Sequence, residues 1–131
     1  TCVDVWFRAV LGVENYEQRF DLNTSEYGAR IIKRKTTSLT FLCGELANTP
    51  EPLFDLIYVD GSHRGQDVLV DAALCWRLLV PGGIMICDDY LWTKQGVPVP
   101  PRPAIDAFLV CHTDCRVLHK DYQVIVEKML P

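Results

Sequence analysis

Two short apolar runs that each end in carboxylates constrain the fold of this chain more than any other feature. The first run is FDLIYVD, residues 54 to 60, and the second is IMICDD, residues 84 to 89. Continuous hydrophobicity of this kind is typical of a strand that is buried on both faces, as in a parallel sheet covered by helices. We therefore expect two buried strands whose last residues are acidic.

The segment between these runs carries the clearest helical pattern in the chain. Its apolar residues recur at three-and-four spacing, at positions Val68, Ala72, Cys75, Trp76 and Leu79. Pro81-Gly82-Gly83 is expected to stop this helix. A strand, one helix and a second strand in this order predict two neighbouring parallel strands.

The remaining segments continue the alternation of strands and helices. Further strands are expected at residues 1–6, 29–35, 116–121 and 122–128, and further helices within 14–27 and at 39–46 and 104–111. Gly28 is expected to follow the first of these helices, and Thr37 or Ser38 to cap the second. The last two strands resemble an antiparallel pair. This pattern predicts an α/β fold with a mainly parallel sheet, formed by a single domain over residues 1–131.

Charge and hydropathy exclude several classes of partner. The net charge is −4 and 49% of the residues are hydrophobic, and no basic stripe with interleaved aromatic residues is present, so we expect no nucleic-acid binding. The apolar runs are far shorter than the ~20 residues of a membrane helix, and the first residues do not resemble a signal peptide. We therefore expect a cytoplasmic protein that does not bind membranes.

The six cysteines favour reduced thiols over disulfides. Cys75 and Cys87 lie inside expected core elements, and the spacing of the six is irregular. The group formed by Cys111, His112, Asp114 and Cys115 offers zinc ligands, but no second pair of ligands accompanies it. The end of a helix with two small apolar thiols is the favoured interpretation of this group.

Three aspartates close the two central strands. In open parallel sheets, ligands bind beyond the carboxyl ends of the strands, so Asp60, Asp88 and Asp89 are expected to face a binding site. One such acid is more often a helix cap or part of a turn. At two neighbouring strand ends, however, three carboxylates repel one another and favour a bound cation, and their oxygen ligands suit magnesium, manganese or calcium better than zinc. Because adjacent side chains seldom point to one place, Asp89 is the acid that could turn away.

Two further residues complete the candidate site. His63 follows Asp60 in the sequence Asp-Gly-Ser-His, where Gly61 permits a tight turn. A lone histidine there is usually a surface residue, but beside a bound dication a neutral imidazole can take a proton from a substrate hydroxyl. Asp4, near the end of the first expected strand, is placed where nucleotide-binding α/β folds hold ribose hydroxyls.

The sequence resembles class I S-adenosylmethionine-dependent methyltransferases, and within them the metal-dependent O-methyltransferases that act on catechol, macrolide sugars and cephalosporin-type substrates. The resemblance rests on FDLIYVDGSH, the following helix, LLVPGG, a buried strand and DDY, and it covers nearly the whole chain. It implies a Rossmann-like sheet, mainly parallel with a terminal antiparallel strand. It also implies S-adenosylmethionine as cofactor, Mg²⁺ or Mn²⁺ as metal, and a hydroxylated small molecule as substrate.

The resemblance also assigns roles to residues. It implies metal binding by Asp60, Asp88 and Asp89, and a general-base role for His63. It implies cofactor contacts for Asp60 as well, for Asp4 at the ribose and for Ser38 near the adenine. Tyr90 and Trp92 lie where substrate could pack, and both could equally be core or lid residues. The proline-rich segment from Gly96 to Pro103 is the candidate lid.

One part of the family pattern is not found in these 131 residues: the first strand and its glycine-rich turn. The expected fold is therefore a class I sheet truncated at its N-terminus. Either the strand at 1–6 pairs directly with the strand at 54–60, or another chain, such as a second copy, covers the gap. There are two alternatives to an active O-methyltransferase. One is a methyltransferase-like interaction module without activity, and the other is an α/β enzyme that uses the acids with magnesium for phosphate chemistry.

Overall fold

The computed structural model describes residues 1–6, 15–49 and 51–130. The chain forms two compact units, Thr1–Phe41 and Leu42–Pro131. The prediction of a single domain stays a prediction. Within the described ranges, every helix is too short or too polar to cross a bilayer.

The first unit contains a small parallel sheet and two short helical segments. These are β1 (Cys2–Asp4), α1 (Tyr16–Asn23), the 3₁₀ helix η1 (Ser25–Arg30) and β2 (Lys33–Lys35). Asn15 caps α1 by accepting a hydrogen bond from the Gln18 amide at 3.2 Å. The strand expected at 29–35 is shorter than predicted, because Arg30 still belongs to η1, whose backbone turns at Gly28 with φ of +49°.

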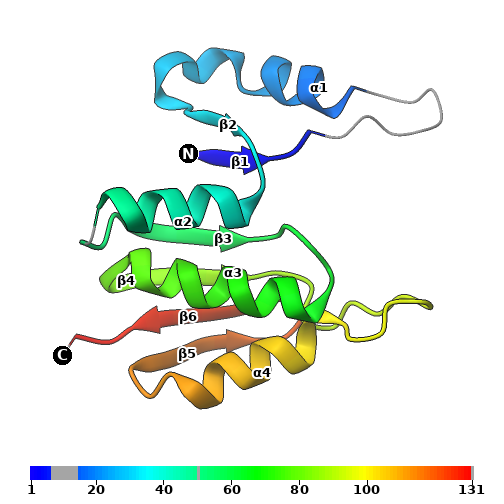
Figure 1. Ribbon diagram of the computed structural model, residues 1–131, viewed down its shortest axis with the longest axis vertical. Coiled ribbons are helices and arrows are strands. Elements are labelled where there is room, and N and C mark those ends of the chain that lie inside the picture. The colour runs from blue at the N-terminus through cyan, green and yellow to red at the C-terminus, as the bar shows by residue number, and fades with distance from the viewer. Residues whose placement is uncertain (7–14, 50, 131) are drawn as a thin grey trace. The chain divides into compact units, whose positions relative to one another are not determined.

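The second unit is built on a four-stranded sheet in the order β3, β4, β6, β5 (Figure 1). Its elements are β3 (Phe54–Val59), α3 (Gly65–Leu78), β4 (Leu79–Cys87), α4 (Pro101–Cys111), β5 (Cys115–Lys120) and β6 (Val124–Lys128). β3 and β4 are parallel, and β6 is antiparallel to both β4 and β5. The predicted α/β class, the parallel central pair and the antiparallel final pair are confirmed. The helix α2 (Ser38–Asn48) spans the boundary between the two units.

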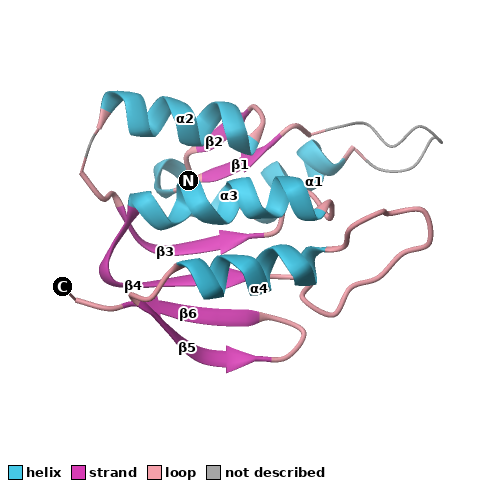
Figure 2. Cartoon of the chain, turned by 60° about the horizontal axis from the view of Figure 1, so that its bottom comes forward, coloured by secondary structure: helices cyan, strands magenta, loops and turns pink. Residues whose placement is uncertain are grey.

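The core of the second unit lies between the sheet and the helices α3 and α4, which cover the same face (Figure 2). Trp76 of α3 and Phe108 of α4 meet edge to face, with ring centroids 5.4 Å apart. Both are almost fully buried. The strands contribute Met85, Val124 and Val126, which are also buried, so burial of apolar surface is the main stabilising term of this unit.

The predicted end of the helix at Pro81-Gly82-Gly83 is wrong. The helix ends at Leu78, and Leu79 is already the first residue of β4, paired with Phe54. The Lys128 ammonium donates hydrogen bonds to the carbonyl oxygens of Trp76 and Leu79 at 2.8 and 2.9 Å. These carbonyl groups at the end of the helix therefore have a hydrogen-bond donor. Pro81, Gly82 and Gly83 instead lie within β4, where its register against β3 shifts between Leu79 and Ile84.

β3 is less buried than its sequence predicts. Leu56 is 61% exposed and Tyr58 is 50% exposed, whereas the alternating residues Ile57 and Val59 are more buried. Leu56 and Tyr58 therefore lie on the face of the sheet opposite to the one that α3 and α4 cover. Within the first unit β1 pairs with β2, and within the second unit β3 pairs with β4. Direct pairing between the strand near residues 1–6 and that near 54–60 stays a prediction. Coverage of the β3 edge by another chain stays a prediction.

The final helix starts earlier than predicted. Residues Pro101 to Pro103, expected in a loop, form the first turn of α4. Proline suits this position because its fixed φ is helical and the first turn needs no amide donor. The proposed lid is therefore shorter, and part of it is fixed to the start of α3, where the Gly65 amide donates to the Val99 carbonyl at 2.8 Å.

Candidate functional site

The parallel pairing of β3 and β4 brings their acidic ends to one edge of the sheet. Val59 and Cys87, the last residues of these strands, are register partners. The Asp88 amide then donates to the Val59 carbonyl at 3.0 Å and continues the ladder by one residue. Asp60 and Asp88 therefore follow paired positions, as the sequence predicts.

Asp60, His63 and Asp89 form a close cluster at this edge. One ligand atom from each of the three lies within 4.8 Å of the other two. His63 Nε2 is 2.6 Å from Asp89 Oδ2, and the Asp89 side chain is only 17% exposed. Asp89 reaches this position with a positive φ of +59°, a conformation that aspartate tolerates better than most residues.

Asp88 points to different partners. Its Oδ2 accepts a hydrogen bond from the Tyr58 hydroxyl, and its Oδ1 accepts from the Gln123 side chain at 3.3 Å and from the Asp89 amide at 2.9 Å. The sequence argument that two adjacent acids seldom point to one place is correct. Asp89, the acid that could have turned away, lies with Asp60 and His63, and Asp88 is the one that turns to other partners. The ligand roles of all three aspartates stay predictions.

Burial, repulsion between acids and hydrogen bonds all act on the pKa values at this edge. Burial raises the pKa of the Asp60 carboxyl above its ordinary value, and the charges of Asp88 and Asp89 raise it further, while His63 opposes them. Burial also acts to raise the pKa of Asp88, but the hydrogen bonds that it accepts outweigh this, so its net pKa is lowered. The Asp88 hydrogen bond raises the pKa of the Tyr58 hydroxyl to about 12. A cation at this edge would relieve the repulsion.

Three residues that contact the acids escaped the sequence analysis: Tyr58, Tyr122 and Gln123. The Tyr122 hydroxyl donates to Asp89 Oδ1 at 2.9 Å. Tyr122 and Gln123 lie in the turn between β5 and β6, far from the acids in sequence. Only the register of β6 against β4 places them here, and no local pattern in the sequence signals it.

The two aromatic residues after the acids have different surroundings. Tyr90 is 5% exposed and donates from its hydroxyl to Asp106 at 3.0 Å, so it belongs to the core. Trp92 packs on the His63 ring, with centroids 4.5 Å apart. Of the pair expected near substrate, Trp92 is thus the one beside the acidic cluster.

The cofactor residues expected at Asp4 and Ser38 lie in the first unit. Asp4 is the last residue of β1, and its Oδ1 accepts a hydrogen bond from the Trp6 amide at 3.0 Å. Ser38 is the first residue of α2, and the cap before it is Thr37, whose hydroxyl accepts from the Thr40 amide at 3.1 Å. Their contacts with a cofactor stay predictions.

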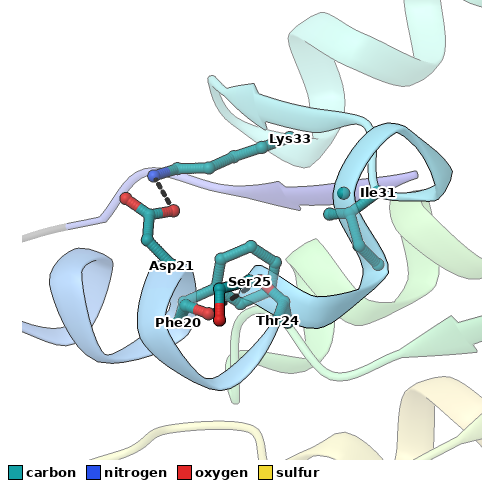
Figure 3. Close-up of a pocket in the computed structure, with 7 residues that line it drawn as sticks. Phe20, Asp21, Thr24, Ser25, Ile31 and Lys33 are labelled. Atoms are coloured by element: carbon teal, nitrogen blue, oxygen red, sulfur yellow. Dashed lines mark hydrogen bonds and ion pairs between the residues drawn. The ribbon is translucent and has the colours of Figure 1, made fainter.

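A hollow of about 220 Å³ also lies in the first unit, lined among others by Phe20, Thr24, Ile31 and Lys33 (Figure 3). Asp21 and Lys33, which both line it, form an ion pair at 2.7 Å. None of the residues predicted for the site lines this hollow.

The zinc ligands considered near the end of α4 have other partners. The His112 ring stacks on Phe108, with centroids 4.2 Å apart, and Asp114 accepts a hydrogen bond from the Trp76 indole at 3.2 Å. All six cysteines are unpaired. The donor set with the clearer metal-binding chemistry is therefore the Asp60, His63 and Asp89 cluster, whose carboxylate oxygens suit a hard divalent cation.

A family model described as a methyltransferase domain matches residues 1–90, more than half of the chain. The chain belongs to this methyltransferase domain family. The match includes both acidic strand ends, with Asp60, Asp88 and Asp89, so the cluster lies inside the region that the family shares. Among curated proteins no match is found.

Solved structures similar to this methyltransferase domain confirm its Rossmann-like fold. A protein from Corynebacterium glutamicum has a TM-score of 0.69 at 16% identity, with 99% of this chain and 60% of that chain covered. MycE methyltransferase from the mycinamycin biosynthetic pathway, in complex with Mg and SAH, has a TM-score of 0.62 at 15% identity, with 97% and 44% covered. An O-methyltransferase from Bacillus cereus in complex with SAH has a TM-score of 0.60 at 18% identity, with 88% and 60% covered. This methyltransferase domain thus spans 44 to 60% of the length of these three proteins.

Proposed function

We propose that this chain forms part of a metal-dependent O-methyltransferase that transfers a methyl group from S-adenosylmethionine to a hydroxylated small molecule. The observation that carries the proposal is the cluster of Asp60, His63 and Asp89 at the carboxyl ends of two parallel strands. Ligands bind at this edge in open α/β sheets, and the chain belongs to a methyltransferase family. The MycE and Bacillus cereus structures, which contain SAH, support the same cofactor here.

The residues at the acidic edge fit a divalent cation. Asp60 and Asp89 offer carboxylate oxygens in one cluster, and Asp88 adds a third negative charge beside them. These hard ligands favour Mg²⁺ or Mn²⁺. We propose all three aspartates as residues of the metal site: Asp60 and Asp89 through their clustered oxygens, and Asp88, whose oxygens accept hydrogen bonds from Tyr58 and Gln123, through its neighbouring charge. When bound, the ion supplies positive charge that lowers the pKa of a substrate hydroxyl.

His63 is the proposed general base. Its Nε2 lies 2.6 Å from Asp89, and its ring packs against Trp92, so the imidazole is oriented by a carboxylate on one side and an aromatic ring on another. A neutral imidazole held in this way could accept the proton of a substrate hydroxyl. Orientation and charge neutralisation account for the remaining catalysis, without a covalent enzyme intermediate.

The cofactor contacts of the proposal come from three residues. Asp4 would accept hydrogen bonds from the ribose hydroxyls, since a carboxylate offers about four acceptor sites and the Trp6 amide uses one. Asp60 and Ser38 would contribute further polar contacts. S-adenosylmethionine supplies an activated methyl group when it is bound.

Calorimetric titration of the 131-residue chain with S-adenosylhomocysteine, with and without Mg²⁺, tests this proposal. Micromolar binding that is lost in Asp4→Ala supports it. Asp60→Asn should lose Mg²⁺ binding. Asp55→Asn, its matched control, changes an exposed acid within β3 and should bind Mg²⁺ as the unchanged chain does. A folded chain that binds neither S-adenosylhomocysteine nor Mg²⁺ would overturn the proposal and favour an interaction module without activity.

A further inference from the structure

The turn between β5 and β6 contacts both adjacent acids at the end of β4. Tyr122 donates from its hydroxyl to Asp89 Oδ1 at 2.9 Å. Gln123 donates from its side-chain amide to Asp88 Oδ1 at 3.3 Å and to the Tyr58 hydroxyl at 2.9 Å. Two consecutive residues of one turn therefore each hold one of two consecutive acids.

The backbone fixes this turn against the acids. Val124, the first residue of β6, pairs with Cys87, the last residue of β4. Beyond this pair, the Tyr90 amide donates to the Tyr122 carbonyl at 2.8 Å. The positions of both turn residues thus follow from the register of the sheet. Their side chains contact the acids from a turn whose backbone is already fixed.

Asp89 is held through both of its carboxylate oxygens. Oδ1 accepts from Tyr122, and Oδ2 lies 2.6 Å from His63 Nε2, so two elements fix the plane of the carboxylate. The Asp88 carboxylate accepts the Asp89 amide at 2.9 Å, which supports the positive φ of Asp89. The orientation of Asp89 toward Asp60 therefore depends on partners outside the acidic cluster.

We propose that Tyr122 and Gln123 are positioning residues of the metal site, which orient the carboxylates of Asp89 and Asp88 for a divalent cation. This inference rests on the proposed function. Groups that donate hydrogen bonds to metal-binding carboxylates fix their orientation, and their loss typically weakens metal affinity by roughly 10- to 100-fold. Each carboxylate offers about four acceptor sites, so these hydrogen bonds leave capacity for the ion.

The test is a calorimetric titration of Mn²⁺ into the 131-residue chain and its variants. Tyr122→Phe removes only the hydroxyl, and Gln123→Leu replaces the side-chain amide by an apolar group of similar size. Matched controls are Tyr16→Phe, at an exposed tyrosine of α1, and Gln95→Leu, at an exposed glutamine. We expect about 10-fold weaker Mn²⁺ binding in Tyr122→Phe, a larger loss in the double variant, and affinities within about twofold of the unchanged chain in both controls.

Urea unfolding of the metal-free variants separates positioning from general support of the fold. A structural role alone would lower the free energy of unfolding and leave the Mn²⁺ affinity of the folded chain unchanged, and that result would overturn the inference. If the unchanged chain binds Mn²⁺ and Asp60→Asn abolishes the binding while the double variant keeps it, the proposed metal site stands and only the role of the turn fails. An unchanged chain that binds no Mn²⁺ would overturn both.

Discussion

The two units of this chain are stabilised in different ways. In the second unit, apolar side chains such as Phe108, Ile105 and Met85 are at most 1% exposed. In the first unit, none of the described residues is buried, and ion pairs link α1 to β2, from Lys33 to Glu17 at 3.0 Å and from Lys35 to Glu17 at 2.7 Å. Exposed ion pairs contribute at most about 1 kcal/mol each, whereas a buried aromatic side chain contributes several.

This difference matters for the candidate site. Asp60, Asp88 and Asp89 follow strands that are backed by the apolar core, so their backbone positions are set by the most stable part of the chain. Asp4 and Ser38 belong to the unit whose described residues have no such core. We therefore expect metal binding to survive conditions that disturb the first unit. The four variants below measure how differently the two units are stabilised.

The largest effect is expected for Phe108→Ala. Phe108 is 1% exposed and contacts both Trp76 and His112, so the change leaves a cavity that should lower the free energy of unfolding by about 3–5 kcal/mol. Urea unfolding followed by tryptophan fluorescence measures it. Val110→Ala on the same helix, at a residue 81% exposed, should change the free energy by less than about 0.5 kcal/mol. Equal effects of the two variants would show that α4 does not build the core.

A smaller effect is expected for Gly65→Ala at the start of α3. A Cβ at this position would lie 2.8 Å from Val99 Cγ1 and 2.9 Å from the Pro100 carbonyl oxygen, so the proline-rich segment must shift. Overpacking of this kind costs about 1–3 kcal/mol. Thermal unfolding checks the prediction, with Gly44→Ala as control, because a Cβ at Gly44 meets no atom within 4 Å. A stabilising Gly65→Ala would contradict the close packing.

An acid-dependent effect of about 1 kcal/mol or less is expected from Asp106. The Lys120 ammonium is the main cause that lowers the pKa of Asp106 below its ordinary value of 3.8, with the Tyr90 hydroxyl as a further cause. Because the pKa is lower in the folded chain, the stabilisation is present above pH of about 4 and is lost as the pH falls through the folded value. Urea unfolding between pH 6 and pH 3 should show a shallower loss for Asp106→Asn than for the unchanged chain. An identical pH dependence of the two would refute this role of Asp106.

The smallest effect is expected for Glu17→Gln in the first unit. The change removes the ion pairs to Lys33 and Lys35, which lie at the surface and are weakened by salt. Hydrogen exchange should become faster at the Cys2 amide, which donates to Ile32 beside β2, and stay unchanged at the Asp88 amide. The difference should vanish in about 1 M salt, where the Debye length is only about 3 Å. Faster exchange at Asp88 would mean that the two units do not differ in this way.

Local patterns in the sequence predicted the elements that carry the acids. The α3 helix and the β3 and β4 strands were recognisable because the apolar period of a helix and the continuous hydrophobicity of a buried strand are properties of neighbouring residues. Asp60, Asp88 and Asp89 are predictable because they follow such strands directly, and His63 because it lies just past Asp60. The close approach of Asp60, His63 and Asp89 agrees with this prediction, and the roles of all four residues stay proposals.

Contacts between distant residues were beyond the reach of these patterns. Leu79 fits the apolar period of α3 equally well, but pairing with Phe54 and the hydrogen bonds from Lys128 place it in β4. The exposure of Leu56 also depends on which strands and helices lie beside β3, and the hydrophobicity of β3 itself carries no information about that.

The sequence by itself determined the α/β class, the strand–helix–strand order and the family, because these depend on residue types and spacings along the chain. Only the tertiary structure decided which of the two adjacent acids, Asp88 or Asp89, joins Asp60 and His63. It also decided that Tyr122 and Gln123 hold those acids. The reason is physical: the direction of a side chain at a strand end depends on the register of a strand more than thirty residues away, and that register is set by packing of the whole sheet.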